Sequence, residues 1–392
     1  MRKFLILFSL VVIASAIMAN DARESALGYG AKYFIDDNNV VYCPAMALRY
    51  PGYVKLELGT YAGSGFTPTG QWGMANVAIG DNFAIGGALR RSEGDAFWLA
   101  GEIGMTPPNP GLDIWGAYKI GSLNLGVGAY LASDSYKEVD DNNNTEIFNK
   151  SGVMDFKVSA ETELLGGYWQ IPIWITMNSV KTEDTNADNE TQTDEITGGM
   201  EIGACLRGYM PIADNVELVP RLHFTTFSYS REYTPYTGDA TEYGDYSRMT
   251  LNAGCACNVG VLDDGLVSVG AAIGMANVTD EVDTTNKTED KTMHLPEITI
   301  AAEIPATDWL VVRGGVTKLF ITDTHIAGDV EQTTKDPEMA SAFASLGFGV
   351  NFSGFALDFT MSEDKLFEGP YMLSGVENVW AFRGSMSFNW QE

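Results

Sequence analysis

The feature of this sequence that most constrains its fold is a recurring alternation of apolar and polar residues. In "MDFKVSAETE" (154–163), apolar positions alternate with Asp155, Lys157, Ser159 and Glu161. The segments "MTLNAGCACNVGV" (249–261), "EITIAAEI" (297–304) and "FALDFTM" (355–361) alternate in the same way. Because side chains of a β-strand point to opposite faces in turn, each segment predicts a strand with one apolar and one polar face.

From about Leu112 onward, short turns and long polar loops are predicted to join these segments in turn. The short turns lie at 121–122, 166–167, 213–215, 263–265, 307–308 and 353–354. The long loops cover roughly 134–151, 180–195, 231–245, 279–293, 322–339 and 363–377. This pattern is typical of outer-membrane barrels. A secreted β-sandwich gives the same strand alternation with its apolar face inside, so it stays as the alternative.

The strand count follows from parity. Counting back from the chain end predicts about thirteen strands down to Leu112, so an even barrel needs an odd number before it. Four segments are candidates, at 53–62, 72–80, 83–90 and 96–105. At least one of them is therefore not a wall strand. The predicted fold is an all-β transmembrane antiparallel barrel of about 14–16 strands.

The N-terminus predicts export. Met1-Arg2-Lys3 is basic, "FLILFSLVVI" (4–13) is an apolar core too short to span a bilayer, and small residues follow up to Ala19. This is the pattern of a secretory signal peptide, residues 1–19, cleaved after Ala19. With 52 acidic and 24 basic residues and a net charge of −28, the chain is a poor partner for nucleic acid. The expected location is a bacterial outer membrane, crossed many times.

Residues 20–52 do not continue the strand pattern. Glycines, an Asp36–Asn39 run, Pro44 and Pro51 interrupt any regular ladder, yet the segment holds too many apolar residues for a solvated tail. We expect it to be an ordered plug inside the barrel. The predicted organisation is thus a signal peptide at 1–19, a plug at 20–52 and a barrel at 53–392.

Within that segment, "ALGYGAKYFIDDNNVVYCPAMAL" (26–48) resembles the plug, or hatch, of FadL-type hydrophobic-compound transporters and related PorV-like barrels. The residues that carry the resemblance are Asp36, Asp37, Asn38 and Asn39, which match a polar run, and Tyr42, Pro44 and Ala45, which match an aromatic-Asn-Pro-Ala phrase. Cys43 stands where Asn is usual in that phrase. The resemblance implies a 14-stranded barrel with its plug in the lumen. It also implies that hydrophobic molecules pass sideways into the bilayer, through a wall kink near the plug.

Inward positions on the predicted wall complete the candidate site. They are Cys205, Arg207, Arg221, His223, Gly254, Gly270 and Gly274. Small residues leave room for a plug to approach the backbone, although glycine also relieves strand curvature. A Cys43–Cys205 bridge between plug and wall is one hypothesis. The inward charges could line a water-filled pore or hold the plug by salt bridges.

The sequence offers candidates for two further kinds of site. The loop "DTNADNETQTDE" has oxygen-bearing side chains at the spacing of a calcium loop, namely Asp184, Asn186, Asp188, Glu190, Gln192 and Glu195. Asn189 replaces the usual glycine, so a solvated acidic loop is the alternative. No other cofactor is expected. The three histidines, at 223, 294 and 325, lie outside any nucleophile motif, and we expect no enzyme.

The last strand, "FRGSMSFNW", places one row of residues on a single face: Phe382, Gly384, Met386, Phe388 and Trp390. We predict that this row faces lipid and closes the barrel against the first strand. It also resembles the signal that the barrel assembly machinery reads, although Gln391 and Glu392 follow the aromatic residue here.

Together these observations favour a channel for passive uptake of small, hydrophobic molecules. Its expected partners are outer-membrane lipids, the assembly machinery and a small hydrophobic ligand. Two rivals remain open. A general diffusion porin would have an open, conducting lumen, and a structural or secretion-partner barrel would transport nothing.

Overall fold

The computed structural model describes residues 21–62, 70–89, 99, 108, 110–140, 145–238, 241–262, 264–283, 286–328, 330–335, 342–352, 355–363 and 380–389. The signal-peptide prediction lies outside these residues. The strands are β1 (Gly52–Ala62), β2 (Gly73–Ile79), β3 (Phe83–Leu89), β4 (Gly111–Ile120), β5 (Leu123–Asp140), β6 (Thr145–Leu164), β7 (Gly167–Thr185), β8 (Thr191–Ala213), β9 (Val216–Thr234), β10 (Thr241–Val261), β11 (Gly265–Asp283), β12 (Asn286–Thr307), β13 (Leu310–Ala327), β14 (Val330–Lys335), β15 (Ala342–Phe352), β16 (Phe355–Glu363) and β17 (Trp380–Asn389).

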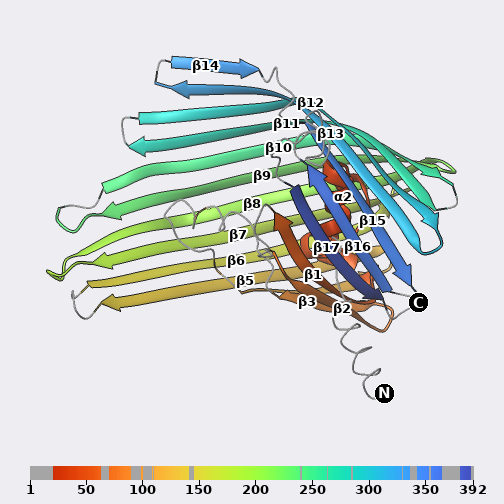
Figure 1. Ribbon diagram of the computed structural model, residues 1–392, viewed down its shortest axis with the longest axis horizontal. Coiled ribbons are helices and arrows are strands. Elements are labelled where there is room, and N and C mark those ends of the chain that lie inside the picture. Colours follow the sequence, from red (N-terminus) through yellow and green to blue (C-terminus); the bar gives the residue numbers. More distant parts are fainter. Residues whose placement is uncertain are drawn as a thin grey trace.

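These strands form one closed antiparallel barrel (Figure 1). Neighbours in sequence pair around the wall, and β17 pairs with β1 from Tyr53↔Asn389 to Ala62↔Ala381. β14 pairs only with the end of β13 among the described residues, and β13 continues the wall by pairing with β15. The wall has 16 strands, the upper end of the predicted range. Three described strands precede Leu112, so the odd number required by parity is confirmed.

The two faces of the wall are as different as the alternation predicts. On β6, Phe156 and Val158 are exposed on the outside, whereas Asp155 and Lys157 are buried toward the lumen. An antiparallel barrel that is apolar outside and polar inside satisfies its backbone hydrogen bonds between strands and can stand in lipid. The transmembrane barrel is therefore confirmed, and the soluble sandwich is excluded.

One end of the barrel is formed by tight turns, such as Gly121-Ser122 and Gly166. Positive φ values at Gly121 and Gly166, 63° and 72°, are the conformation that favours glycine in such turns. We call this the turn end, and the opposite end the hairpin end. The start of β1 and the end of β17 both lie at the turn end, because Tyr53 pairs with Asn389.

The long polar loops were largely wrong predictions. Residues 134–140 belong to β5 and 180–185 to β7, and β8 runs for 23 residues from Thr191. A barrel strand needs only about 9–11 residues to cross a bilayer. The additional length carries polar cross-strand pairs, including Thr324 with Thr333 and Arg231 with Asp194. Such pairs stabilise a sheet in water, so the strands continue beyond the lipid at the hairpin end.

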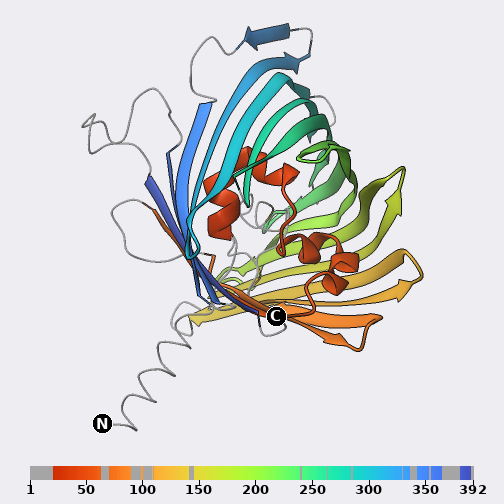
Figure 2. The ribbon, with the colours of Figure 1, turned by 90° about the vertical axis from the view of Figure 1, so that its right-hand side faces the viewer.

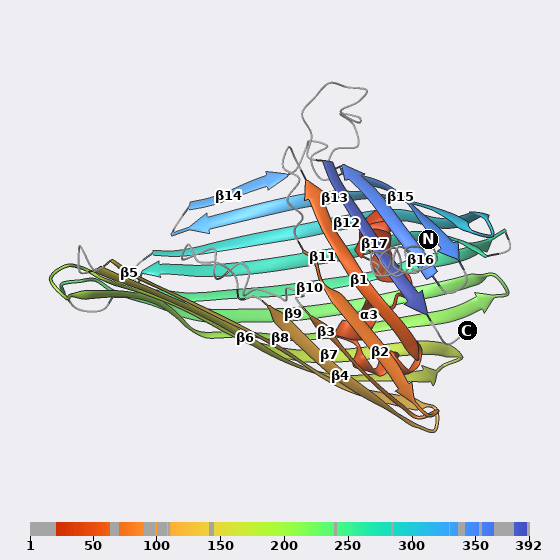
Figure 3. The ribbon, with the colours of Figure 1, turned by 60° about the horizontal axis from the view of Figure 1, so that its bottom comes forward.

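The wall is also uneven, as Figures 1 and 3 show. β2 and β3 have 7 residues each, whereas β5 has 18. The β1–β2 ladder ends at Leu56↔Gly73, followed only by a hydrogen bond from Glu57 N to Trp72 O at 2.6 Å. Toward the hairpin end, residues 59–62 of β1 pair with β17 but with no described strand on the β2 side. Residues 133–140 of β5 likewise pair with β6 but with no described strand on the β4 side. We call this stretch of wall the short side.

The plug segment forms four short helices within the barrel (Figure 2). They are α2 (Asp21–Leu27), η1 (Gly28–Tyr33), α3 (Asn39–Tyr42) and η2 (Pro44–Leu48). Residues of α2 and η1 lie near β12, β13, β15 and β16, and η2 lies near β4, β5 and β6. No helix in the described part of the chain is long and apolar enough to cross a membrane.

Candidate functional site

The plug docks on wall positions that lack a side chain. A Cβ at Gly126 would lie 2.1 Å from the backbone N of Ala45, and a Cβ at Gly315 would lie 2.3 Å from the carbonyl O of Leu27. Contacts this close exclude any larger residue without displacing the plug. Ala45 N also donates a hydrogen bond to Ser159 Oγ on β6 at 2.8 Å. The backbone of the plug and the wall are therefore in direct contact.

Tyr33 extends this docking to β10 and β11. A Cβ at Gly254 would lie 2.4 Å from Tyr33 Oη, and one at Gly270 would lie 2.8 Å from its ring. Asn258 Nδ2 on β10 donates to Tyr33 O at 2.9 Å. Burial raises the pKa of the Tyr33 hydroxyl, and the charge of Glu297 adds to the rise. Tyr33 therefore stays neutral and acts as a packing residue.

Ion pairs hold the N-terminal half of the plug. Arg23 Nε contacts Glu303 Oε2 on β12 at 2.7 Å, and Arg23 also pairs with Asp36 within the plug. Burial works against the charged guanidinium, but the carboxylates of Asp36 and Glu303 raise its pKa well above the ordinary value. Arg313 on β13 joins Glu303 at 2.5 Å, so one carboxylate bridges plug and wall.

Lys55 on β1 binds the polar turn of the plug. Its side chain is fully buried; it pairs with Asp37 and donates to Asn38 Oδ1 at 2.7 Å. The pKa of Asp36 is depressed: burial opposes ionisation, but Arg23 and Lys55 favour it. Burial raises the pKa of Asp37 to about 6, with Lys55 opposing the rise and Asp36 adding to it. The polar run predicted from sequence thus anchors the plug to the first strand.

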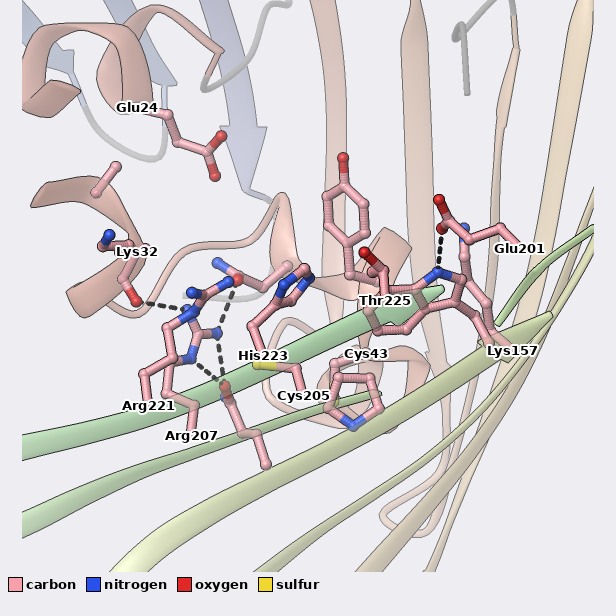
Figure 4. Close-up of a pocket in the computed structure, with 16 residues that line it drawn as sticks. Glu24, Lys32, Cys43, Lys157, Glu201, Cys205, Arg207, Arg221, His223 and Thr225 are labelled. Atoms are coloured by element: carbon pink, nitrogen blue, oxygen red, sulfur yellow. Dashed lines mark hydrogen bonds between the residues drawn. The ribbon is translucent and has the colours of Figure 1, made fainter. Parts of the chain in front are cut away.

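A cavity of about 530 Å³ lies between the plug and the wall (Figure 4). The plug contributes one side and strands β6, β7, β8 and β9 contribute the other. Its lining residues are Glu24, Ala31, Lys32, Asn39, Tyr42, Cys43, Lys157, Gln170, Pro172, Trp174, Glu201, Cys205, Arg207, Arg221, His223 and Thr225. A cavity of this size, with aromatic and charged groups together, is suited to one small organic molecule.

Arg207 joins the plug to the floor of this cavity. Its Nε and Nη2 donate to Gln170 Oε1 at 2.8 and 2.6 Å, its Nη2 donates to Asn39 Oδ1 at 2.7 Å, and its Nη1 donates to Lys32 O at 3.2 Å. The side chain is 7% exposed. Two of these hydrogen bonds join the wall to the plug and two hold the guanidinium against β7, so Arg207 is a fixed part of the plug's seat.

The aromatic groups of the cavity lie on β7, β9 and the plug. The rings of Trp174 and His223 are 5.6 Å apart at 33°, and Trp174 Nε1 donates to Glu201 Oε1 at 2.7 Å. Tyr42 on α3 exposes half of its surface, 53%, and Lys157 Nζ lies 5.6 Å from its ring centroid. The hydrogen bond fixes the indole, so flat apolar surfaces face the cavity in a defined position.

The cavity brings together seven of the residues predicted from sequence, which are Asn39, Tyr42, Cys43, Cys205, Arg207, Arg221 and His223. Cys43 and Cys205 line it as free thiols, so the proposed bridge between them is wrong. Burial raises the pKa of the Cys43 thiol to about 12, which keeps it a neutral, inert group. Pro44 and Ala45 pack against Gly126, outside the cavity.

Other predicted residues lie apart from it. Gly254 and Gly270 face Tyr33, whereas a Cβ at Gly274 would meet Asn252 and His294 on the wall. Asp184 and Glu195 belong to β7 and β8, on either side of a turn in which Asn186 bonds Glu190. No group of three His, Cys, Asp or Glu side chains that could hold a metal ion occurs among the described residues, and the calcium loop stays a prediction.

The closing strand lies where the sequence predicts. Phe382, Gly384, Met386 and Phe388 belong to β17, which pairs with β1, while Trp390 lies outside the described residues. Met386 packs with Leu56, Leu58, Phe355 and Leu357 on the outer face of the seam. Its recognition by an assembly machinery stays a prediction.

Sequence reasoning missed several residues of the plug's seat. Lys55, Ser159 and Asn76 were not singled out. Asn76 Nδ2 donates to Ala47 O at 2.7 Å, and Asn76 Oδ1 accepts from Trp115 Nε1 at 3.0 Å. Trp174 and Lys32 were missed at the cavity. Strand alternation places Lys55 on the inner face, between Val54 and Leu56, and so offered a signal for that residue.

Comparisons with known proteins bear on the architecture alone. No family model and no curated protein matches the chain. The toluene transporter TodX of Pseudomonas putida is 9% identical, with a TM-score of 0.41 over 91% of this chain and 94% of that one. The toluene transporter TbuX of Ralstonia pickettii is 10% identical, with a TM-score of 0.39 over 90% and 93%.

BauA, the ferric preacinetobactin receptor from Acinetobacter baumannii, is 12% identical, with a TM-score of 0.44 over 80% of this chain and 54% of that one. These TM-scores are below 0.5, and the barrel is established by the strand pairing of the chain itself.

Proposed function

We propose that this protein is an outer-membrane channel for the passive uptake of small hydrophobic molecules. The observation that carries the proposal is the cavity between plug and wall, with the ring surfaces of Trp174 and Tyr42 on its lining. A molecule that enters from the hairpin end would occupy this cavity before the plug admits it further. The cavity supplies a dry, shaped resting place, and the plug prevents free flow of water and ions.

The contacts between plug and wall favour a channel that the plug gates over a channel that is always open. A barrel of 16–18 strands ordinarily leaves an aqueous channel. Here η1 and η2 lie near wall strands on both sides of the lumen. Arg207, Lys55 and Glu303 bind other parts of the plug, namely α3, the polar turn and α2. A general diffusion porin would gain nothing from so many plug contacts. A purely structural barrel would have no use for a cavity lined by oriented aromatic and charged groups.

The exit that we propose is lateral and lies on the short side. The β1–β2 ladder has only five described residue pairs, from Gly52↔Val77 to Leu56↔Gly73. Lys55, which binds the plug's polar turn, lies within that short ladder. Movement of the turn would therefore act on the least-paired part of the wall, and a hydrophobic molecule could leave there for the bilayer.

The proposal is tested by filling the cavity. Thr225 on β9 lines it, whereas Thr226 lies on the outer face of the same strand. Cells with a lipopolysaccharide outer membrane that express the protein should take up the neutral fluorophore N-phenyl-1-naphthylamine faster than cells without it. We expect Thr225→Trp to abolish the increase and Thr226→Trp to leave it intact, with folded yield checked by electrophoretic mobility. Equal uptake by the two variants, or a steady porin-like conductance of the intact protein, would contradict the proposal.

A further inference from the structure

The cavity is basic in a strongly acidic protein. The whole chain has 52 acidic and 24 basic residues. The cavity lining reverses this balance, with the basic residues Lys32, Lys157, Arg207 and Arg221 against the acidic Glu24 and Glu201. An excess of one sign within a low-dielectric cleft raises the local concentration of molecules of the opposite sign.

The four cations differ in their partners. Lys32 Nζ contacts Glu297 Oε1 at 2.5 Å, and Lys157 Nζ contacts Asp155 Oδ2 at 2.7 Å. Arg207 donates only to neutral acceptors, and Arg221 Nη1 donates to the amide Asn252 Oδ1 at 3.3 Å. Neither arginine forms an ion pair with a carboxylate in the described part of the chain. Partly buried positive charge of this kind is stabilised by an anion that enters the cavity.

Arg221 is the cation with the most unused donors. All three guanidinium nitrogens of Arg207 donate hydrogen bonds, to the plug and to Gln170. Among the described residues, Arg221 donates one long hydrogen bond, from Nη1. Lys32 on the plug lies close enough to Arg221 for their charges to interact: burial lowers the pKa of Lys32, Glu297 opposes this, and Arg221 lowers it further. An anion between the two cations would remove their repulsion and would join plug to wall.

The rest of the lining indicates the shape of the molecule that bears the charge. His223 lies two residues from Arg221 on the same face of β9, and its ring is tilted at 33° against that of Trp174. The indole is held by Glu201, and the half-exposed ring of Tyr42 on the plug also lines the cavity. Fixed ring faces next to an unpaired guanidinium form a binding site for a flat apolar group with one negative charge at its edge.

We propose that the cavity binds a small aromatic monocarboxylate. Arg221 and Lys32 hold the carboxylate, and the rings of Trp174 and Tyr42 contact the aromatic part. This inference rests on the proposed function and names the class of molecule that the channel concentrates. Neutral aromatic compounds enter the same cavity but lack the anchor.

The test measures binding by calorimetry with the full mature chain in nanodiscs of zwitterionic lipid. The probes are 2-naphthoate, the neutral 2-naphthamide of the same shape, and the linear acid decanoate. We expect 2-naphthoate to bind about tenfold or more tightly than 2-naphthamide, the difference that a charge-assisted pair commonly makes. Decanoate should bind more weakly than 2-naphthoate, because its chain cannot stack on the rings.

Arg221→Gln should abolish the preference for naphthoate over naphthamide. Arg231→Gln is the matched control, because Arg231 lies on the same face of β9 but pairs with Asp194 at 2.6 Å near the hairpin end. Unchanged preference in Arg221→Gln, or equal affinity for naphthoate and naphthamide in the unmodified chain, would overturn the anionic site. Tighter binding of decanoate would overturn the aromatic class. If uptake of the neutral fluorophore still depends on Thr225 in that case, the channel proposal stands and this inference alone fails.

Discussion

At the scale of single residues, the charged groups of the plug are the most consequential. Lys55 has no exposed surface and serves two side chains of the polar turn, Asp37 and Asn38. Removing one partner of a buried ion pair generally costs about 3–5 kcal/mol, because the other charge is left in a poor environment. The docked plug therefore depends on the protonation of a few carboxyls.

Asp37 makes plug docking sensitive to mild acid. Burial raises its pKa to about 6, against about 3.9 in an undocked, hydrated chain. A carboxyl whose pKa is raised on docking stabilises the docked plug fully when the pH is below its pKa in the undocked chain. This stabilisation is lost as the pH rises through its pKa in the docked plug. We therefore expect docking to weaken between pH 5 and pH 8, by roughly tenfold in the opening equilibrium.

Protease cleavage of the plug, followed by mass spectrometry at each pH, measures this opening. Asp37→Asn should flatten the profile, because the amide carries no titrating proton. Asp36 behaves in the opposite sense, since its pKa is depressed and its contribution is lost only in stronger acid. Plug cleavage that becomes faster toward acid pH would refute the assignment to Asp37. So would an unchanged pH dependence of cleavage in Asp37→Asn.

Residue types alone predicted part of this site. The Asp36–Asn39 run and the inward Arg207, Arg221 and His223 were found from motif and alternation. Lys55 was missed because alternation gives its inward direction but does not show the acidic partner that it meets on the plug. The free state of Cys43 was also beyond prediction, since two cysteines on the inner face can share a cavity without bonding geometry.

At the scale of elements, the sequence predicts strands well where they cross lipid and poorly where they leave it. Within the bilayer the outer face must be apolar, so β6 alternates visibly between Asp155 and Phe156. Beyond the bilayer both faces meet water and both become polar, and the composition then equals that of a loop. That is why residues 134–140 and 180–185 were assigned to loops although they are paired strands.

The extended β5–β6 hairpin should accordingly be dispensable for insertion. Lys137 pairs with Phe148, so replacing residues 138–147 by Asn-Gly leaves a two-residue turn on an intact ladder. We expect the shortened protein to reach the outer membrane with undiminished folded yield, as measured by heat-modifiable electrophoretic mobility.

Deletion of Val158 alone is the contrasting change. Val158 faces outward within the lipid-crossing part of β6, and removing one residue moves every following side chain to the opposite face. That variant should not fold. Loss of the shortened hairpin protein, or normal assembly of the Val158 deletion, would show that the two regions have been placed on the wrong sides of the membrane boundary.

At the scale of the whole molecule, the plug determines whether the barrel is a closed or an open body. Parity restricted the wall to an even number of about 14–16 strands, and the structure has 16. The cavity was not predicted, because its lining combines the plug with four wall strands much further along the chain. Which inward side chains meet is set by strand register and by plug docking. Neither strand register nor plug docking can be predicted from local sequence patterns.

Deleting residues 21–48 should turn the protein into a conducting pore. The wall is closed without them, since no strand pairing in the described part of the chain involves the plug, and a barrel of this size leaves an aqueous channel. We expect planar-bilayer conductance to rise about tenfold or more over the intact protein. Equal conductance with and without the plug would mean that the intact lumen is already open, and the porin alternative would then be favoured.

The uneven wall gives the molecule a front and a back. The difference between the 7 residues of β2 and the 23 of β8 amounts to roughly 50 Å measured along the strands. The strands of the tall side extend well beyond the lipid, whereas the described residues of β2 and β3 do not. A solute that diffuses along the membrane surface therefore reaches the mouth of the barrel over the short side only. The orientation of the protein about the membrane normal sets the direction in which the short side faces. Neighbouring molecules that fix this orientation therefore influence which solutes reach the mouth.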